Sequence, residues 1–148
     1  MQYPSTTNIL PRGGTPQGGN RPPSAGGDTI EIVAAPVKAA ISLGVLNQVD
    51  IRVGTIERVE DVPGAEKLVA LRVDFGDHKR TIVAGLKHER ANPREIEGRQ
   101  ALFVVNLERR KMRGVMSEGM LFDIGYADGI TPVLAVPESP VPNGTRAG

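Results

Sequence analysis

The segment VDIRVGTI, residues 49–56, gives the first evidence of how this 148-residue chain folds. Apolar and polar side chains alternate from Val49 to Val53, which is the period of a β-strand with one apolar face. The next apolar residue of the pattern, Ile56, falls out of this alternation just after Gly54. An extra residue at a β-bulge explains the slip, and such a kink lets one long strand bend and belong to both halves of a closed barrel.

The segments after residue 56 contain turn signals about every ten residues, the rhythm of a small all-β barrel rather than of alternating strands and helices. Residues 69–75 alternate at period two and predict a second strand, whose partner lies over residues 80–84, beyond a turn at Gly76-Asp77. Further strands are expected over residues 100–106, 120–124 and 132–136.

One helix is predicted between the third and the fourth strand. Asn92 is a typical N-cap residue, Pro93 suits the first helical position, and Gly98 ends the helix early. Five or more strands with one short helix predict an all-β fold, an OB-type barrel with an extended C-terminal segment. A sandwich of the same strands is the alternative.

The composition changes along the chain and predicts its domain organisation. Residues 1–36 contain six prolines and six glycines, so they offer too little apolar surface to offset the entropy lost on ordering, and a disordered tail is predicted. Residues 37–48 are more apolar and are expected to pack against the domain as a short lead-in. Residues 49–148 are expected to form the OB-fold domain.

The charge balance and the absence of cysteine restrict the classes of function. Residues 1–48 contain three of the 18 cations and two of the 17 anions, which leaves 15 of each for residues 49–148. Any site for a polyanion must therefore be a local patch. No cysteine is present, which excludes disulfides and thiolate metal sites. No apolar run approaches the ~20 residues of a membrane span, and a cytoplasmic protein without a membrane partner is expected.

The most basic segment is residues 109–113, with four cations in five positions. It follows a predicted buried strand, and glycines at positions 114 and 119 permit backbone geometry that other residues resist. Such a segment suits a polyanionic ligand. A hairpin whose charges only face solvent is the alternative, because charge runs are usually solvated surface.

Five motifs, in order and in spacing, resemble the tRNA-binding domain family. They are Asp50-Ile51-Arg52-Val53-Gly54, Pro63-Gly64-Ala65-Glu66-Lys67-Leu68, Ile82-Val83-Ala84-Gly85-Leu86, Asn106-Leu107 followed by Arg110-Lys111-Met112-Arg113-Gly114, and Ser117-Glu118-Gly119-Met120. The family includes stand-alone bacterial tRNA-binding proteins, the C-terminal domain of many methionyl-tRNA synthetases, and synthetase-associated cofactors of eukaryotes. The resemblance covers residues 49–146 and implies an OB barrel that binds structured tRNA without strong sequence preference, and a homodimer in bacterial members.

The resemblance also implies which side chains contact tRNA. Cations are expected to follow the phosphates, Asn106 and Ser117 to bond a base edge or a ribose hydroxyl, and Met120 to offer an apolar surface. Structural roles are the alternatives: Asn106 as a strand cap, Ser117 as a turn residue and Met120 as core. Arg52 is expected to be structural, paired across the sheet. The candidate tRNA-binding residues are Lys67, Lys87, Asn106, Arg109, Arg110, Lys111, Arg113, Ser117 and Met120.

The sequence departs from the family pattern at several positions. Glu108 stands where the family usually has a basic residue, although Arg109, in place of a proline, restores the charge one residue on. Ala84 replaces a common serine, and Val62 replaces a frequent histidine. These changes leave the fold prediction intact and bear on the strength of tRNA binding.

The residue patterns do not predict catalysis. Ser117 is one residue out of register for a G-x-S-x-G nucleophile elbow. His78 and His88 lie in polar turns, ten positions apart, so they indicate neither a catalytic triad nor a metal site, and no cofactor is expected. With only three Phe and two Tyr, stacking platforms for single strands are scarce, which favours a shaped RNA held by its backbone.

Two functional hypotheses follow from the sequence. The first is a non-catalytic tRNA-binding module that acts alone or beside an aminoacyl-tRNA synthetase. The second is a protein-binding chaperone or scaffold, because a bacterial export-related chaperone shares the barrel and the dimer. A homodimer is expected through the apolar segments 41–46 and 133–136, since a domain of about 100 residues has limited core in which to hide both.

Overall fold

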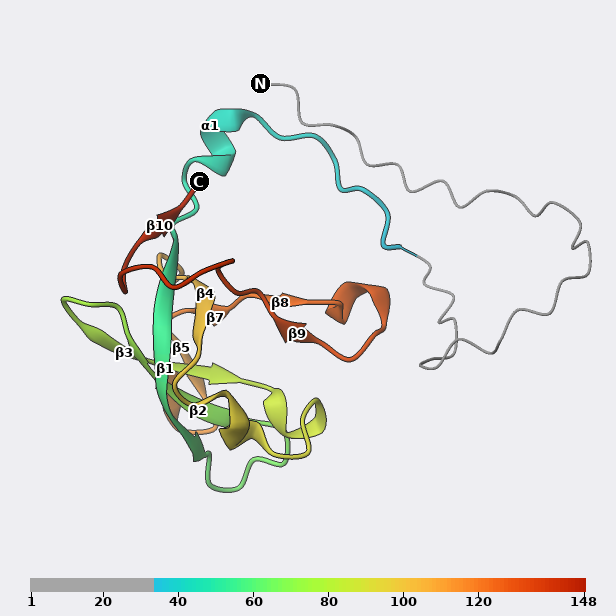
Figure 1. Ribbon diagram of the computed structural model, residues 1–148. Helices are drawn as coiled ribbons and strands as arrows, with labels where there is room; N and C mark the ends of the chain where they lie inside the picture. The colour runs from blue at the N-terminus through green and yellow to red at the C-terminus, as the bar shows by residue number, and fades with distance from the viewer. Residues whose placement is uncertain (1–33) are drawn as a thin grey trace, which may run out of the picture. The chain divides into compact units, whose positions relative to one another are not determined.

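The computed structural model describes residues 34–148, and β-strands are their main regular elements (Figure 1). The predicted disordered tail, residues 1–36, lies outside the described residues as far as residue 33. With η denoting a 3-10 helix, the elements in chain order are α1 (Leu43–Leu46), β1 (Ile51–Asp61), β2 (Val69–Asp74), β3 (Lys79–Ala84), η1 (Leu86–His88), η2 (Pro93–Ile96), β4 (Gln100–Val104), β5 (Arg110–Met112), β6 (Val115–Ser117), β7 (Met120–Leu121), β8 (Asp123–Ile124), η3 (Tyr126–Asp128), β9 (Val133–Leu134) and β10 (Arg146–Ala147).

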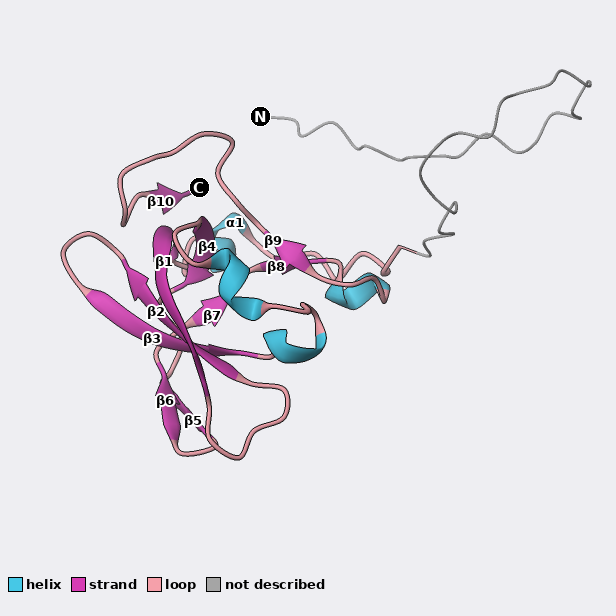
Figure 2. Ribbon diagram, turned by 60° about the horizontal axis from the view of Figure 1, so that its bottom comes forward, coloured by secondary structure: helices cyan, strands magenta, loops and turns pink. Residues whose placement is uncertain are grey.

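Five strands form one antiparallel sheet in the order β3-β2-β1-β4-β7, and β10 pairs with the start of β1. β5 with β6 and β8 with β9 form two separate hairpins (Figure 2). The two ends of the sheet approach each other where the Glu118 amide donates to the Thr81 carbonyl at 2.9 Å. The predicted all-β OB-type fold is therefore confirmed as a curled half-barrel, and it is one sheet rather than the two stacked sheets of a sandwich.

The long strand β1 holds the fold together, as its sequence predicts. Its first half pairs with β4 through residues 51–55, and its second half pairs with β2 through residues 55–61. The register shifts between Ile56 and Arg58, so β1 contains a bulge, but it follows Ile56 and is not at the predicted place between Gly54 and Ile56. A Cβ atom on Gly54 would lie 2.6 Å from a methyl carbon of Val73, which shows that core packing, rather than the bulge, requires this glycine.

Two clusters of buried side chains stabilise the domain. The larger one fills the barrel, and at its centre Phe75 and Phe103 pack edge to face with ring centroids 5.5 Å apart. The smaller cluster consists of Val62, Ala65 and Val83 and lies under the β5–β6 hairpin. The second cluster fixes that hairpin to the barrel.

The shorter elements agree with the sequence predictions in place and differ in length. The helix capped by Asn92 is present as η2, and the Asn92 side chain accepts a hydrogen bond from the Arg94 amide at 3.2 Å. It spans four residues and ends before Gly98, whose φ is +84°. Of the strand predicted over residues 132–136, only β9 is paired, and residues 120–124 divide into β7 and β8.

The side chains of the lead-in, residues 37–48, are exposed, and its last residue, Gln48, accepts a hydrogen bond from Asn106, so packing of the lead-in against the domain stays a prediction. Ser42 caps the single turn of α1, and none of the helix side chains is buried. Leu43 is 71% exposed and Leu46 52% exposed. Apolar composition alone predicted burial, but a four-residue helix presents too narrow an apolar face to cover the barrel by itself.

Candidate nucleic-acid interface

The β5–β6 hairpin presents the basic segment at the surface. Its two-residue loop is Arg113-Gly114, with φ of +49° and +84°. A tight hairpin turn with positive φ at both central residues favours Asn or Gly at the first position. Arg113 is the one non-glycine residue with positive φ among residues 34–148, and unfavourable backbone geometry of this kind tends to be retained at functional sites.

Packing of the apolar side chains makes the hairpin a firm platform. Met112 and Val115 are paired with each other across the hairpin and contact the small cluster beneath it. Side chains alternate along each strand, so the neighbouring pair, Lys111 and Met116, faces the opposite side and is exposed. The hairpin is thus anchored through Met112 and Val115, while Lys111 lies on its outer face and Arg110 is exposed on the same face as Met112.

The cations of the predicted site differ in whether they have an ionic partner. Arg110, Lys111 and Arg113 are exposed and form no ion pair within residues 34–148. Arg109 is 73% exposed and lies 3.6 Å from a carboxylate oxygen of Glu118. The three unpaired cations of the hairpin are therefore the ones most available to a ligand.

Two lysines lie on the connections beside the hairpin. Lys67 is exposed and lines, together with Arg113, a hollow of about 550 Å³ under the hairpin tip. The Lys87 ammonium lies 3.3 Å from Asp61 and donates to the Ala65 carbonyl at 3.0 Å. The structure therefore brings Lys67 to the hairpin tip, whereas Lys87 is already engaged in contacts that hold the preceding connection in place.

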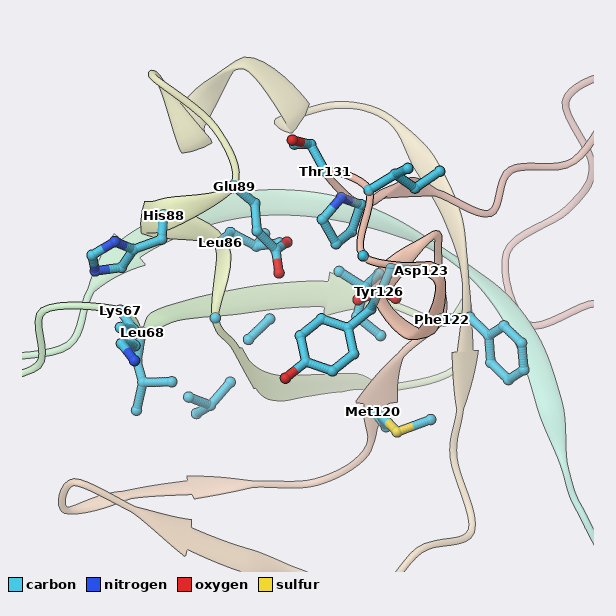
Figure 3. A pocket seen from close by; sticks show the side chains of 17 residues that line it. Lys67, Leu68, Leu86, His88, Glu89, Met120, Phe122, Asp123, Tyr126 and Thr131 are labelled. Atoms are coloured by element: carbon cyan, nitrogen blue, oxygen red, sulfur yellow. The ribbon is translucent and has the colours of Figure 1, made fainter. Parts of the chain in front are cut away.

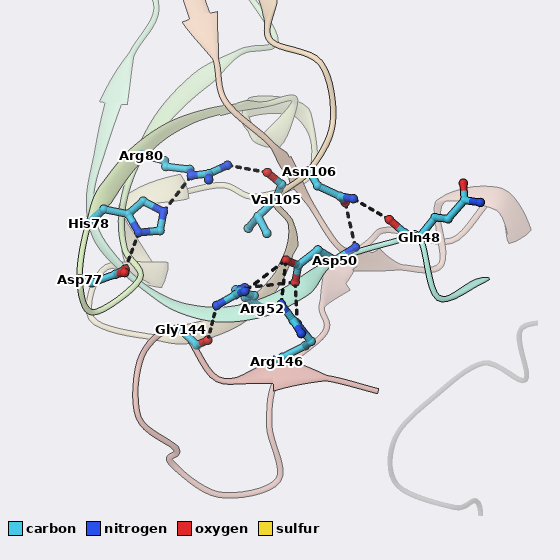
Figure 4. A network of polar contacts seen from close by, with 10 residues as sticks. All are labelled: Gln48, Asp50, Arg52, Asp77, His78, Arg80, Val105, Asn106, Gly144 and Arg146. Carbon is cyan, nitrogen blue, oxygen red and sulfur yellow. Dashed lines mark hydrogen bonds and ion pairs between the residues drawn. The ribbon is translucent and has the colours of Figure 1, made fainter. Parts of the chain in front are cut away.

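Asn106, drawn in Figure 4, and Ser117 make structural hydrogen bonds at the two ends of the basic segment. The Asn106 amide accepts from the Asp50 backbone at 2.8 Å and donates to the Gln48 carbonyl at 2.6 Å. The Ser117 hydroxyl is 4% exposed, accepts from the Val83 amide at 3.0 Å and donates to the Gly119 carbonyl at 3.1 Å. Both structural alternatives are present, and RNA contact by these two side chains stays a prediction.

Sequence reasoning missed Arg80, which ties the basic segment to β3. Its guanidinium donates to the Val105 carbonyl at 2.5 Å and to the Glu118 carbonyl at 3.1 Å, and its Nε donates to His78 at 2.9 Å (Figure 4). These acceptors lie at both ends of the segment that contains the hairpin. The sequence places Arg80 in a strand, and nothing in a strand pattern indicates which distant carbonyls a side chain reaches.

Arg52 is structural, as expected, but its partner is different from the predicted one. It pairs at 3.1 Å with Asp50, which lies just before β1, and it donates to the Gly144 carbonyl at 3.3 Å. Arg146 of β10 approaches the same carboxylate at 3.2 Å. The hydrogen bond from Arg52 holds the pKa of Asp50 below its usual value, burial acts in the opposite direction, and Arg146 lowers the pKa further.

Met120 lies on the wall of a groove of about 940 Å³ and is 46% exposed, so the alternative of a core methionine was wrong. The groove runs between the connection after β3, strand β7 and helix η3 (Figure 3). Glu89, Asp123 and Tyr126 also line it. Burial is the main cause that raises the pKa of Glu89, and the charge of Asp123 is the second. The sequence could not reveal this groove, because its walls come from segments far apart in the chain.

Two further features bear on the class of protein. Within residues 34–148, no group of three or more His, Asp and Glu side chains is suited to hold a metal ion. In the same part of the chain, no helix has the length and apolar character needed to cross a membrane.

Comparison with protein families assigns the domain. Residues 51–146 match the family model described as "Putative tRNA binding domain". The matched range includes the sheet, the basic hairpin and the groove. The chain belongs to the tRNA-binding domain family.

Individual relatives agree with this assignment. The chain is 39% identical over 113 residues to the methionine--tRNA ligase of Parabacteroides distasonis, and the aligned part is 76% of this chain and 16% of the ligase. The crystal structure of a MetRS related protein from Pyrococcus horikoshii is similar with a TM-score of 0.69 and 32% identity, covering 75% of this chain and 100% of that one. The crystal structure of the chaperone CsaA from Bacillus anthracis str. Ames is similar with a TM-score of 0.63 and 27% identity, covering 74% and 100%.

Proposed function

We propose that this chain is a non-catalytic, cytoplasmic tRNA-binding module whose β5–β6 hairpin contacts the RNA backbone. The observation that carries the proposal is the set of unpaired cations on a hairpin anchored to the barrel. Arg110, Lys111 and Arg113 face solvent, while the apolar side of the same hairpin is packed on a buried cluster. A hairpin anchored to the barrel presents these cations at a set place on the surface, which suits contact with a phosphate backbone.

The remaining candidates extend the contact surface. Lys67 lies on the same hollow as Arg113, and Arg109 lies at the base of the hairpin, so phosphates can be followed from one to the other. Lys87, Asn106 and Ser117 keep a role in shaping this surface through their existing hydrogen bonds. Met120 offers an exposed apolar contact at its edge. The tRNA substrate and a synthetase partner are supported by family membership and by the similarity to a methionine--tRNA ligase.

Salt dependence of tRNA binding tests the proposal. If the contact is mainly with phosphates, the logarithm of the association constant falls linearly with the logarithm of the salt concentration. The slope is measured by filter binding or by fluorescence anisotropy of a labelled tRNA. Salt concentrations from about 50 to about 300 mM cover the range in which a loss of affinity is measurable. Absence of binding at the lowest salt, or affinity that does not change with salt, contradicts the proposal.

A homodimer is part of the proposed function, because exposed apolar side chains remain at two places. Val133 is 52% exposed and Val136 46% exposed, and on α1 Leu43 is 71% exposed. A twofold interface that covers them also gives one particle two basic hairpins, so a single tRNA gains from the effective concentration of the second contact.

Point substitutions test the dimer better than truncation, since Leu134 is buried in the core and β10 pairs with β1. Val133→Ser with Val136→Ser is expected to give monomers in light scattering at micromolar concentration without loss of the thermal transition. Wild-type monomers at that concentration contradict the dimer. If dimers persist in this variant and also in a variant that carries Leu43→Ser, the interface lies elsewhere.

Protein binding is the second candidate, supported by the similarity to a chaperone structure at 27% identity and by the apolar groove walls. A chaperone binds unfolded polypeptides through apolar surface and does not require the hairpin cations. This second function is favoured if the wild type and a variant without the hairpin cations both capture an unfolded polypeptide and tRNA binding is absent.

A further inference from the structure

The groove lies next to the basic surface. Lys67 and Leu68 line both the hollow under the hairpin tip and the larger groove, so the two are adjacent. An RNA backbone that contacts Arg113 and Lys67 would thus lie beside the groove. The volume of about 940 Å³ lies within the range of small-ligand sites and exceeds what one nucleobase needs.

The chemistry of the groove does not suit a phosphate. Two carboxylates, Glu89 and Asp123, line it together with Lys67 and His88, and the carboxylates disfavour a phosphate beside them. Carboxylate oxygens accept hydrogen bonds from the exocyclic amino groups of bases, such as N4 of cytosine. The raised pKa of Glu89, with burial as its first cause and Asp123 as its second, shows that its negative charge is poorly compensated, although Arg90 acts in the opposite direction. Hydrogen-bond donors are therefore the ligand groups that these carboxylates suit.

The groove also has a stacking surface. The Tyr126 side chain lies across the opening, and the Glu89 carboxyl points into the same space from the opposite connection (Figure 3). Tyr126 is 76% exposed and Met120 46% exposed. Aromatic faces and soft methionine side chains are the surfaces on which unstacked RNA bases are held.

We propose that the groove receives one unpaired base with an exocyclic amino group, while the adjoining phosphates stay on Lys67 and Arg113. Tyr126 stacks on the base, and Glu89 and Asp123 accept hydrogen bonds from its amino group. The inference rests on the proposed RNA binding by the hairpin, and it adds a base preference to a contact that is otherwise independent of sequence.

The first test separates stacking from charge. Tyr126→Ala is expected to weaken tRNA binding by about 10-fold and to leave the slope against salt unchanged, because no cation is lost. Tyr126→Phe keeps the ring and is expected to bind as the wild type does. If Tyr126→Ala binds tRNA as tightly as the wild type does, the groove proposal is overturned. If the wild type shows no salt-dependent tRNA binding, the proposed function is overturned instead.

The second test examines the amino group. Cytosine and uracil differ at C4, where one has an amino group and the other a carbonyl, so oligo(C) is expected to bind more tightly than oligo(U) of equal length. In Glu89→Gln with Asp123→Asn the preference is expected to disappear, since a carboxamide also donates to the uracil carbonyl. Equal affinity of the wild type for both oligonucleotides overturns the base preference.

The third test asks whether a polypeptide occupies the groove. Reduced, carboxymethylated lactalbumin serves as a permanently unfolded probe and is expected not to displace tRNA. The RNA base is overturned as the occupant if two results are obtained together. The probe displaces tRNA from the wild type but not from Tyr126→Ala, and Tyr126→Ala keeps its affinity for tRNA.

Discussion

Two arginine-rich regions of this domain differ in what their charges do. On β1 and β10, Arg52 and Arg146 both contact the carboxylate of Asp50, so their charges are used within the fold. On the hairpin, Arg110 and Arg113 have no ionic partner among the described residues. Side chains of one kind thus serve stability in one region and remain available for a ligand in the other.

The comparison shows that basic residues must be judged by their partners rather than by their number. Both regions belong to motifs that resemble the same family, and neither motif by itself indicates which arginine is free. The distinction comes from tertiary contacts, because Arg146 reaches Asp50 from the other end of the chain. Substitutions at the Asp50 cluster are therefore expected to lower stability and to leave RNA binding unchanged. Substitutions of the hairpin cations are expected to weaken RNA binding and to leave stability nearly unchanged.

The largest effect is expected from removing the three hairpin cations together. Arg110→Ala with Lys111→Ala and Arg113→Ala is expected to weaken tRNA binding on the order of 100-fold at 0.1 M salt and to reduce the salt slope by roughly 2 to 3. Thermal stability is expected to change little, because exposed substitutions usually cost less than about 0.5 kcal/mol. Anisotropy with labelled tRNA and a thermal melt measure the two quantities.

A matched variant controls for net charge. Arg72, Arg94 and Arg99 are exposed and form no ion pair within residues 34–148, so replacing them with Ala removes the same charge elsewhere. This variant is expected to keep most of the tRNA affinity. Equal losses in the two triple variants mean that the hairpin is not the contact surface.

A smaller effect, on stability alone, is expected from the other region. Asp50→Asn removes the carboxylate shared by Arg52 and Arg146, so the melting temperature is expected to fall while the salt slope of tRNA binding stays unchanged. Since the pKa of Asp50 is lower in the folded chain, its contribution is present above the ordinary value of 3.8 and is lost as the pH falls through the folded value.

Thermal melts between about pH 7 and pH 2 check this linkage. The wild type is expected to lose more stability than Asp50→Asn does as the pH falls below 4, so that the two melting temperatures converge in acid. Glu60→Gln is the control, because the Glu60–Arg58 pair lies on the same strand and is largely exposed. If the melting temperatures of the wild type and of Asp50→Asn change in parallel down to the lowest pH, the Asp50 cluster does not stabilise the fold.

Local periodicity predicted the strands of the fold, most clearly for β2, in which every second residue is buried. A bulge in β1 was predicted from a single break in the alternation at Ile56, although it follows that residue. The hairpin was predicted as a basic segment, but its orientation depends on the packing of Met112 and Val115 on a cluster from the β1–β2 connection and from β3. Such long-range packing leaves no periodic signal.

The groove was not predicted for the same reason. Glu89 follows β3, Asp123 begins β8 and Tyr126 begins η3, so the site forms only when the sheet curls. At the sequence level Tyr126 was one of few aromatic residues and argued against stacking. Its position over the groove provides the ring on which the proposed base would stack.

The smallest effect is the sharpest test of how the two regions differ, and it concerns Arg113 alone. Asn tolerates positive φ better than Arg does, so Arg113→Asn is expected to leave thermal stability unchanged or slightly raised. The same change removes one cation, so tRNA affinity is expected to fall a few-fold and the salt slope by about 1.

The two readouts of Arg113→Asn separate a functional arginine from a structural one. Arg113 has φ of +49° and no ionic partner within residues 34–148, so only a ligand would benefit from its charge. Weaker tRNA binding with unimpaired stability therefore identifies it as a contact. A lower melting temperature with unchanged affinity places Arg113 with Arg52 among the structural cations and removes it from the RNA-binding surface.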